Sequence, residues 1–234
     1  AKRRNGEWAL DGRADVDDLD ANGPTLAGDR LKLDRVAATW DLIGQTGSWE
    51  VRNLEVTSPI GSLKAVGTLP DTPHGQSTIE GSLDLAAIAR QIPRALHLRE
   101  GISVDRGEAR LRIESQATED GQAWNVKARI TDLEAHNQER PLTLREPATL
   151  SARILRRTSE LSVEELALRT SFLDLKAKGD VDRGLGWSGT FELGGLQREL
   201  KGLFDFGKVE LAGKGDVSGT YLRTAGTYQG RLEL

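Results

Sequence analysis

The chain has 234 residues, of which 37% are hydrophobic and 29% are charged, and its formal net charge is −4. This length suits one large β domain or two domains of ordinary size, and the small negative charge provides no basic field for binding nucleic acid. Cysteine is absent, which excludes disulfides, thiolate metal sites and a cysteine nucleophile. No apolar run approaches the roughly 18 residues of a membrane-spanning helix.

Most of the chain alternates apolar and polar residues with period two, which is typical of half-buried antiparallel strands. The first such segment, GEWALDGRADV at 6–16, places Trp8, Leu10, Ala14 and Val16 on one face. The segments SLKAVGTL at 62–69 and TIEGSLDL at 78–85 continue the pattern. On one face of these two segments we expect Leu63, Ala65, Leu69, Ile79, Gly81, Leu83 and Leu85.

The segment DLDANGPTLAGD at 18–29 has nearly the spacing of an EF-hand calcium loop. Its candidate ligands are Asp18, Asp20, Asn22 and Asp29, with oxygens at alternating positions and a glycine at the sharp turn. An EF-hand has a helix on each side, whereas both flanks here are strand-like, and Asn-Gly-Pro beside acids is typical of a turn. We therefore expect a strand-to-strand turn, with weak calcium binding outside an EF-hand as the alternative.

Two blocks of the chain align with later blocks without gaps. Residues 81–109 lie over 189–217, and residues 51–69 lie over 163–181, where SLKAVG matches DLKAKG. Such internal similarity indicates a repeat architecture. We predict a tandem duplication, with one β-rich unit at 1–118 and the other at 119–234.

Each predicted unit contains one short amphipathic helix, at about 85–96 in the first and about 193–204 in the second. Leucine and isoleucine recur there at helical spacing, but Pro93 in the first helix and Gly194 and Gly195 in the second keep the helices short or irregular. Each unit also changes phase, because three residues instead of two separate Val51 from Leu54 and Val163 from Leu166. A β-bulge has this effect and bends its strand, so we expect a curved antiparallel sheet.

The chain offers no constellation of catalytic residues. His74, His97 and His136 lie in unrelated contexts without a second ligand at metal-binding spacing, and no nucleophile elbow, P-loop or dinucleotide-binding motif is present. Adjacent acids on a strand point to opposite faces and do not share a substrate. We therefore predict a protein that is not an enzyme, with no catalytic residues, no cofactor, no metal centre and no nucleic-acid partner.

In both predicted units a strand ending in G-[ST]-[LF]-[DE]-L runs into a short helix and then into strands punctuated by G-x-[AV]. The first unit has GSLDL at 81–85 with GEA at 107–109, and the second has GTFEL at 189–193 with GDV at 215–217. This pattern resembles AsmA-like and TamB-like proteins. The resemblance implies a long curved sheet, the repeating β-groove, in a protein anchored in the inner membrane of diderm bacteria and extending through the periplasm.

The resemblance further implies a role in phospholipid movement or outer-membrane assembly, with acyl chains of phospholipids lying on an apolar groove. We expect the chain to be a segment of a longer protein, whose anchor and contacts with inner- and outer-membrane components lie in other regions. The in-phase residues that we place on the groove are Leu63, Ala65, Leu83, Leu175, Ala177 and Phe191. The alternative role for these residues is the ordinary core of a closed sheet.

Two other functions remain open. One is a structural or adhesive module of the cell envelope, which would have a closed core and no ligand. The other is a carbohydrate-binding or carbohydrate-active envelope protein, which would expose aromatic side chains on one face. The aromatic candidates are Trp40, Trp49, Trp124 and Trp187. Because Trp49 aligns with Leu161 and Trp187 with Ile79, we expect these two to be core residues.

Overall fold

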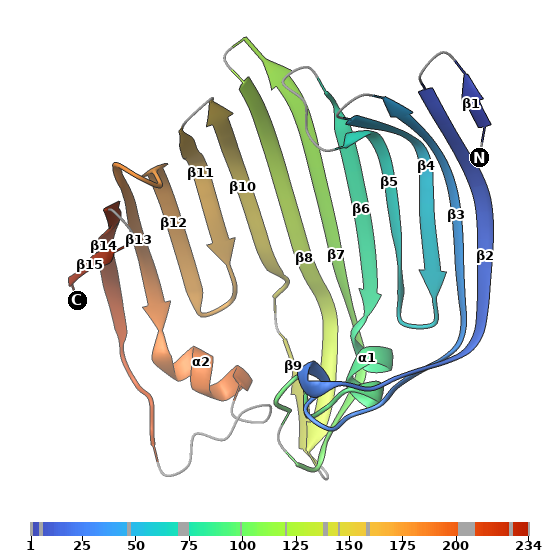
Figure 1. Cartoon of the computed structure of the whole chain (residues 1–234). Helices are drawn as coiled ribbons and strands as arrows, with labels where there is room; N and C mark the ends of the chain where they lie inside the picture. The colour runs from blue at the N-terminus through green and yellow to red at the C-terminus, as the bar shows by residue number, and fades with distance from the viewer. Residues whose placement is uncertain are drawn as a thin grey trace.

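The computed structural model describes residues 2–4, 7–45, 48–69, 75–98, 100–119, 121–137, 140–144, 146–157, 160–200, 209–224 and 227–233. Over these residues the chain forms one antiparallel β-sheet of fifteen strands, with two α-helices at one end of it (Figure 1). The expectation of a mainly β chain with a curved antiparallel sheet is confirmed.

The strands follow one another in the sheet in chain order, so that almost every connection is a hairpin. In the first half of the sheet the strands are β1 (Lys2–Arg4), β2 (Glu7–Ala21), β3 (Leu31–Gln45), β4 (Ser48–Ser58), β5 (Gly61–Leu69), β6 (Ser77–Asp84) and β7 (Ile102–Thr118). In the second half they are β8 (Gly121–Asn137), β9 (Arg140–Thr143), β10 (Ala148–Arg157), β11 (Leu161–Arg169), β12 (Leu173–Asp180), β13 (Gly184–Glu192), β14 (Lys214–Thr224) and β15 (Thr227–Glu233). The short β9 pairs with β8 beside this path.

The helix α1 (Leu85–Gln91) starts at the position predicted for the first helix. The Asp84 carboxylate accepts a hydrogen bond from the Ala87 backbone N–H at 2.9 Å and so caps the helix. The prediction that Leu85 continues the strand face is therefore wrong. The helix also ends before 96, because Pro93 lacks an N–H group and its ring would clash with the carbonyl one turn earlier.

The second helix, α2 (Leu193–Leu200), lies between β13 and β14 as α1 lies between β6 and β7. It starts where the sequence predicts, and the predicted continuation over 201–204 lies outside the described residues. The elements β4 to β7 with α1, and β11 to β14 with α2, occur in the same order. The predicted boundary at 118/119 falls in the hairpin between β7 and β8, which pair with each other up to Thr118 and Gly121 on either side of it. The division into two units and one helix per unit remains a prediction.

Both predicted bulges are present. The register shifts between Val51 and Leu54 on β4, and between Val163 and Leu166 on β11. Val51 pairs with Gly67 and Val163 pairs with Gly179, and both glycines have positive φ, of 115° and 139°. Only glycine adopts such angles readily, so the bulge and its opposite glycine form one device that bends the sheet.

The lower ends of β2 and β3 bend across to α1, where the 3-10 helix η1 (Pro24–Leu26) lies beside it (Figure 1). The Asp29 carboxylate accepts hydrogen bonds from the backbone N–H groups of Arg94 and Ala95, at 2.6 and 2.9 Å. The Lys32 backbone N–H donates to the Gln91 side chain at 3.0 Å. We call this set of hydrogen bonds the η1–α1 clasp. A small apolar cluster joins Ala86 and Ala89 of α1 to Val104 on β7 and Ala135 on β8.

Candidate functional site

One face of the sheet is apolar from β2 to β14. Residues paired across neighbouring strands form rows perpendicular to the strands, and two adjacent rows contain only apolar residues and glycine. The first row is Gly12, Trp40, Leu54, Ala65, Ile79, Ile113, Val126, Ala152, Leu166, Ala177, Trp187 and Gly219. The second row is Ala14, Ala38, Val56, Leu63, Gly81, Leu111, Ala128, Leu150, Leu168, Leu175, Gly189 and Val217. We call this surface the apolar face.

All six residues predicted for the groove lie on the apolar face. Ala65 and Ala177 belong to the first row, and Leu63 and Leu175 to the second. Leu83 and Phe191 lie one row further toward the helices: Leu83 pairs with Ala109 on β7, and Phe191 pairs with Leu173 on β12. The structure therefore groups three of them on β5 and β6 and the other three on β12 and β13.

The leucines and the alanines of this set differ in exposure. Leu63 and Leu83 are 39% and 43% exposed, whereas Ala65 and Ala177 are 4% and 8% exposed. The small alanines form the floor of the surface and the larger neighbouring side chains rise above it. Within the described residues every strand belongs to the same sheet, so no second sheet covers this face.

Aromatic rings cover glycines at three places on the apolar face: Trp40 over Gly12, Trp49 over Gly44 and Phe191 over Gly215. A Cβ atom added to Gly12 would lie 2.7 Å from the Trp40 ring, and one added to Gly215 would lie 2.8 Å from the Phe191 ring. Each ring belongs to the residue directly paired with its glycine. These rings lie close against the neighbouring backbone, which keeps the surface shallow rather than deeply pocketed.

The reverse face of the sheet is polar and rich in ion pairs. Asp15 accepts hydrogen bonds from Arg13 and Arg35 at 2.6 Å each, and these bonds hold the pKa of its carboxyl well below the usual range. Lys64 lies 3.0 Å from Glu55 on the neighbouring strand. Since successive residues of a strand point to opposite faces, the period-two alternation of the sequence makes the whole sheet amphipathic.

The four calcium candidates do not converge on one point. Asp20 forms an ion pair with Arg30 at 2.7 Å, and Asp29 is occupied by the η1–α1 clasp. Asp18 and Asn22 are exposed. Asp18 and Asp20 belong to β2 itself, and the rest of the segment connects β2 to β3, so it is a turn and not an EF-hand. No group of three or more His, Cys, Asp or Glu side chains with metal-binding geometry occurs among the described residues.

Neither tryptophan that was expected in a core is buried. Trp187 lies in the first apolar row, where it pairs with Ala177 and is half-buried. Trp49 is 41% exposed, so the prediction of a core position for it is wrong. Trp49 is the second residue of β4, and its ring lies over Gly44 on β3. On the other side of β3, Trp8 of β2 pairs with the same glycine. Trp8, which was not among the aromatic candidates, lies on the same face because it belongs to the first alternating strand.

In the parts of the chain that are described, no helix has the length and apolar character needed to cross a membrane. Comparison with known proteins found no matching family model, no matching curated protein and no matching solved structure.

Proposed function

We propose that this chain holds the acyl chains of phospholipids on its apolar face, as a segment of a lipid-conducting or outer-membrane-assembly protein of a diderm cell envelope. The observation that carries the proposal is the pair of apolar rows, which cross twelve strands without one polar side chain. Exposed apolar surface of this extent is uncommon on a protein that has no apolar ligand or partner. The periplasm as its location rests on the resemblance described above.

The dimensions of the apolar face suit several acyl chains. With strands about 4.8 Å apart, twelve strands give each row a length of roughly 50 Å along the sheet. One acyl chain spans about 15 Å, half of a hydrocarbon core of roughly 30 Å. Burial of each methylene contributes about 0.8 kcal/mol, so partial cover of a single chain provides several kcal/mol of binding free energy.

The uniformity of the apolar face favours movement of a bound lipid along it over tight binding at one position. The rows have no polar interruption at which an acyl chain would stop, and the flat rings and small side chains leave no deep pocket. A lipid on such a surface keeps its head group in water at the margin while its chains exchange one set of leucine contacts for the next. This mechanism involves binding and sliding, and no covalent chemistry.

The proposal is tested by native mass spectrometry with lipid extraction on the protein expressed in a diderm bacterium. We expect phospholipid to copurify with the native chain and to be lost from the double variant Leu63→Asp/Leu83→Asp. Both leucines are partly exposed, so the carboxylates reach water without unfolding the sheet. Phe191 is a poorer choice, because its ring packs against Gly215.

The matched control is Val66→Asp. Val66 is on β5 beside Ala65, points to the polar face and is 46% exposed. The substitution therefore adds a carboxylate to the other side of the same strand. The Val66→Asp variant should retain lipid, and circular dichroism should show native strand content in the native chain and in both variants. A folded native chain without lipid, or equal lipid in the Leu63/Leu83 variant, would reject the proposal. If the native chain carries no lipid and the Leu63/Leu83 variant unfolds, the result would favour a structural module with a closed core.

A further inference from the structure

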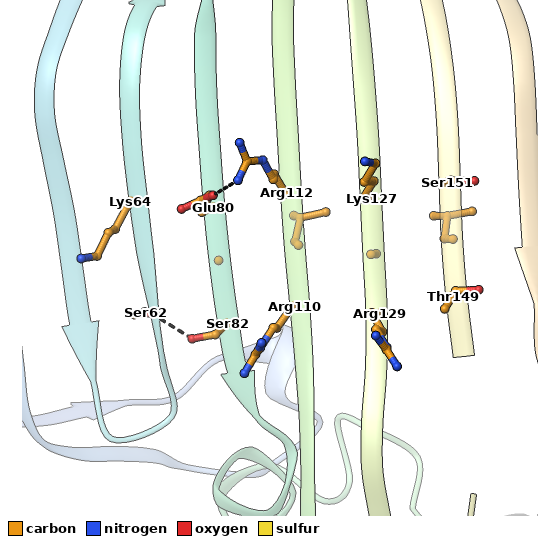
Figure 2. A pocket seen from close by; sticks show the side chains of 14 residues that line it. Ser62, Lys64, Glu80, Ser82, Arg110, Arg112, Lys127, Arg129, Thr149 and Ser151 are labelled. Atoms are coloured by element: carbon orange, nitrogen blue, oxygen red, sulfur yellow. Dashed lines mark hydrogen bonds and ion pairs between the residues drawn. The ribbon is translucent and has the colours of Figure 1, made fainter. Parts of the chain in front are cut away.

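A cluster of cations lies in the middle of the polar face, on the opposite side of the sheet from the apolar face. It lines a shallow hollow of about 600 Å³ that extends from β5 to β10 (Figure 2). Its charged lining residues are Lys64, Glu80, Arg110, Arg112, Lys127 and Arg129. The hollow therefore contains five cationic side chains and a single carboxylate.

The row of polar-face residues that crosses the hollow alternates in charge up to β7 and then stops alternating. Glu55, Lys64, Glu80 and Arg112 follow one another on adjacent strands, with ion pairs of 3.0 Å between Lys64 and Glu55 and 2.6 Å between Arg112 and Glu80. The next residue in the row, on β8, is Lys127. A cation thus lies directly opposite Arg112 where the pattern would place an acid.

In the neighbouring row two cations again lie directly opposite each other, because Arg110 on β7 pairs with Arg129 on β8. Arg110 is bound by Glu108 at 2.7 Å, and Arg112 by Glu80 and Glu114. Lys127 and Arg129 form no ion pair with any side chain in the described part of the chain. Like charges directly opposite each other destabilise a sheet, so both β8 cations raise the local positive potential without compensation.

We infer that the four residues Arg110, Arg112, Lys127 and Arg129, which we call the cationic patch, bind a phosphate group. A guanidinium presents a fork of N–H donors that matches two phosphate oxygens, and an ammonium adds a compact charge. A phosphate placed between Arg110 and Arg129 relieves the repulsion of this pair and interacts with both side chains. A monoanionic carboxylate offers fewer oxygens and less charge.

Hydroxyl groups on both sides of the patch complete the donor set. Ser82 on β6 pairs with Arg110, and Thr149 on β10 pairs with Arg129, so that the order across four strands is hydroxyl, guanidinium, guanidinium, hydroxyl (Figure 2). The Ser62 and Ser82 hydroxyls are 2.9 Å apart and orient each other. A soluble phosphate compound and a phospholipid head group present the same chemistry to these donors.

The experiment compares the native chain with a variant of the patch and a matched control. The patch variant is Lys127→Glu/Arg129→Glu, which places an acid directly opposite Arg112 and another opposite Arg110. The control is Lys176→Glu/Lys178→Glu: these lysines also lie two residues apart on one strand, β12, and point to the polar face, but they face no cation. Both variants change the net charge by the same amount.

In the first arm, the thermal midpoint is measured with inorganic phosphate, pyrophosphate or acetate at constant ionic strength. In the second arm, cosedimentation is measured with vesicles of phosphatidylcholine alone or mixed with phosphatidylglycerol. We expect phosphate or phosphatidylglycerol to bind the native chain and the control variant, and the patch variant to lose at least tenfold in affinity. Response in the first arm identifies a soluble phosphate compound, and response confined to the second identifies a lipid head group.

The patch variant should also have a higher thermal midpoint than the native chain in phosphate-free buffer, because its substitutions remove two like-charge contacts. No response of the native chain in either arm would overturn the inference, and so would an equal loss in the control variant. Loss of lipid from the Leu63/Leu83 variant has no bearing on this result, since those residues lie on the other face.

Discussion

At the scale of single residues, the apolar face depends on glycines that lie under aromatic rings. Trp40 lies over Gly12, Trp49 over Gly44 and Phe191 over Gly215, in each case directly across from its glycine in the neighbouring strand. Glycine normally weakens a strand, because it has no side chain to pack and loses more entropy on folding. Here the ring packs against the bare backbone and compensates for the missing side chain.

We predict that Gly12→Ala destabilises the protein by about 1–3 kcal/mol, the usual range for overpacking a well-packed site. The new methyl group would lie 2.7 Å from the Trp40 ring, so the rigid indole has to move as a whole. Urea unfolding followed by circular dichroism measures the change. Gly81→Ala on the same face is the control, since its methyl group would meet nothing nearer than 3.6 Å. Equal midpoints for the two variants would show that the contact with Trp40 has no energetic role.

At the scale of elements, the η1–α1 clasp joins parts of the chain that are distant in sequence. Asp29 and Arg94 are 65 residues apart, and β4, β5 and β6 lie between β3, which follows Asp29, and β7, which follows Arg94. The clasp draws the lower ends of β2 and β3 across to α1 (Figure 1). It thereby closes one end of the curved sheet while the rest of the apolar face remains uncovered within the described residues.

Replacement of Asp29 by alanine tests the clasp. The change leaves two backbone N–H groups, of Arg94 and Ala95, without their acceptor, and hydrogen bonds to a charged group contribute about 1.5–3 kcal/mol each. We expect faster hydrogen exchange at these two amides and a lower thermal midpoint. Asp20→Ala, which removes only the exposed ion pair with Arg30, should leave both nearly unchanged. If the two variants behave alike, the segment at 18–29 is an ordinary surface turn without a role in closing the sheet.

The same elements indicate how far the sequence predicts the structure. Period-two alternation is a local property, so it correctly places Leu63 and Leu83 on one face, and a change of spacing locates the bulge after Val51. The partner of Asp29 depends on sheet curvature, which no local pattern encodes. Arg110 and Arg129 each alternate with apolar residues, but their juxtaposition requires the register of β7 and β8. The DG pair at 120–121 is a hairpin signal that could have provided this register.

At the scale of the whole molecule, each strand of the sheet is hydrogen-bonded only to its neighbours in an open array. Such a sheet is similar to a linear repeat array, in which stability is a sum of local terms and nearest-neighbour terms. A closed barrel or a sandwich would connect distant strands and make them unfold together. An open array instead allows a change of curvature in one region with little effect on another, which is compatible with the proposed binding of lipids of different size.

This architecture predicts a gradient of hydrogen-exchange protection along the sheet. The hairpin of β7 and β8 has the longest pairing, from Ile102 opposite Asn137 to Thr118 opposite Gly121, and lies in the middle of the strand order. We expect its amides to exchange most slowly, and those of β14 and β15 to exchange through local openings with small denaturant dependence. Native-state exchange in increasing urea distinguishes the two cases. If all strands merged into a single exchange isotherm at low urea, the sheet would unfold as one cooperative unit, and its regions would not bend independently as the proposed binding of different lipids requires.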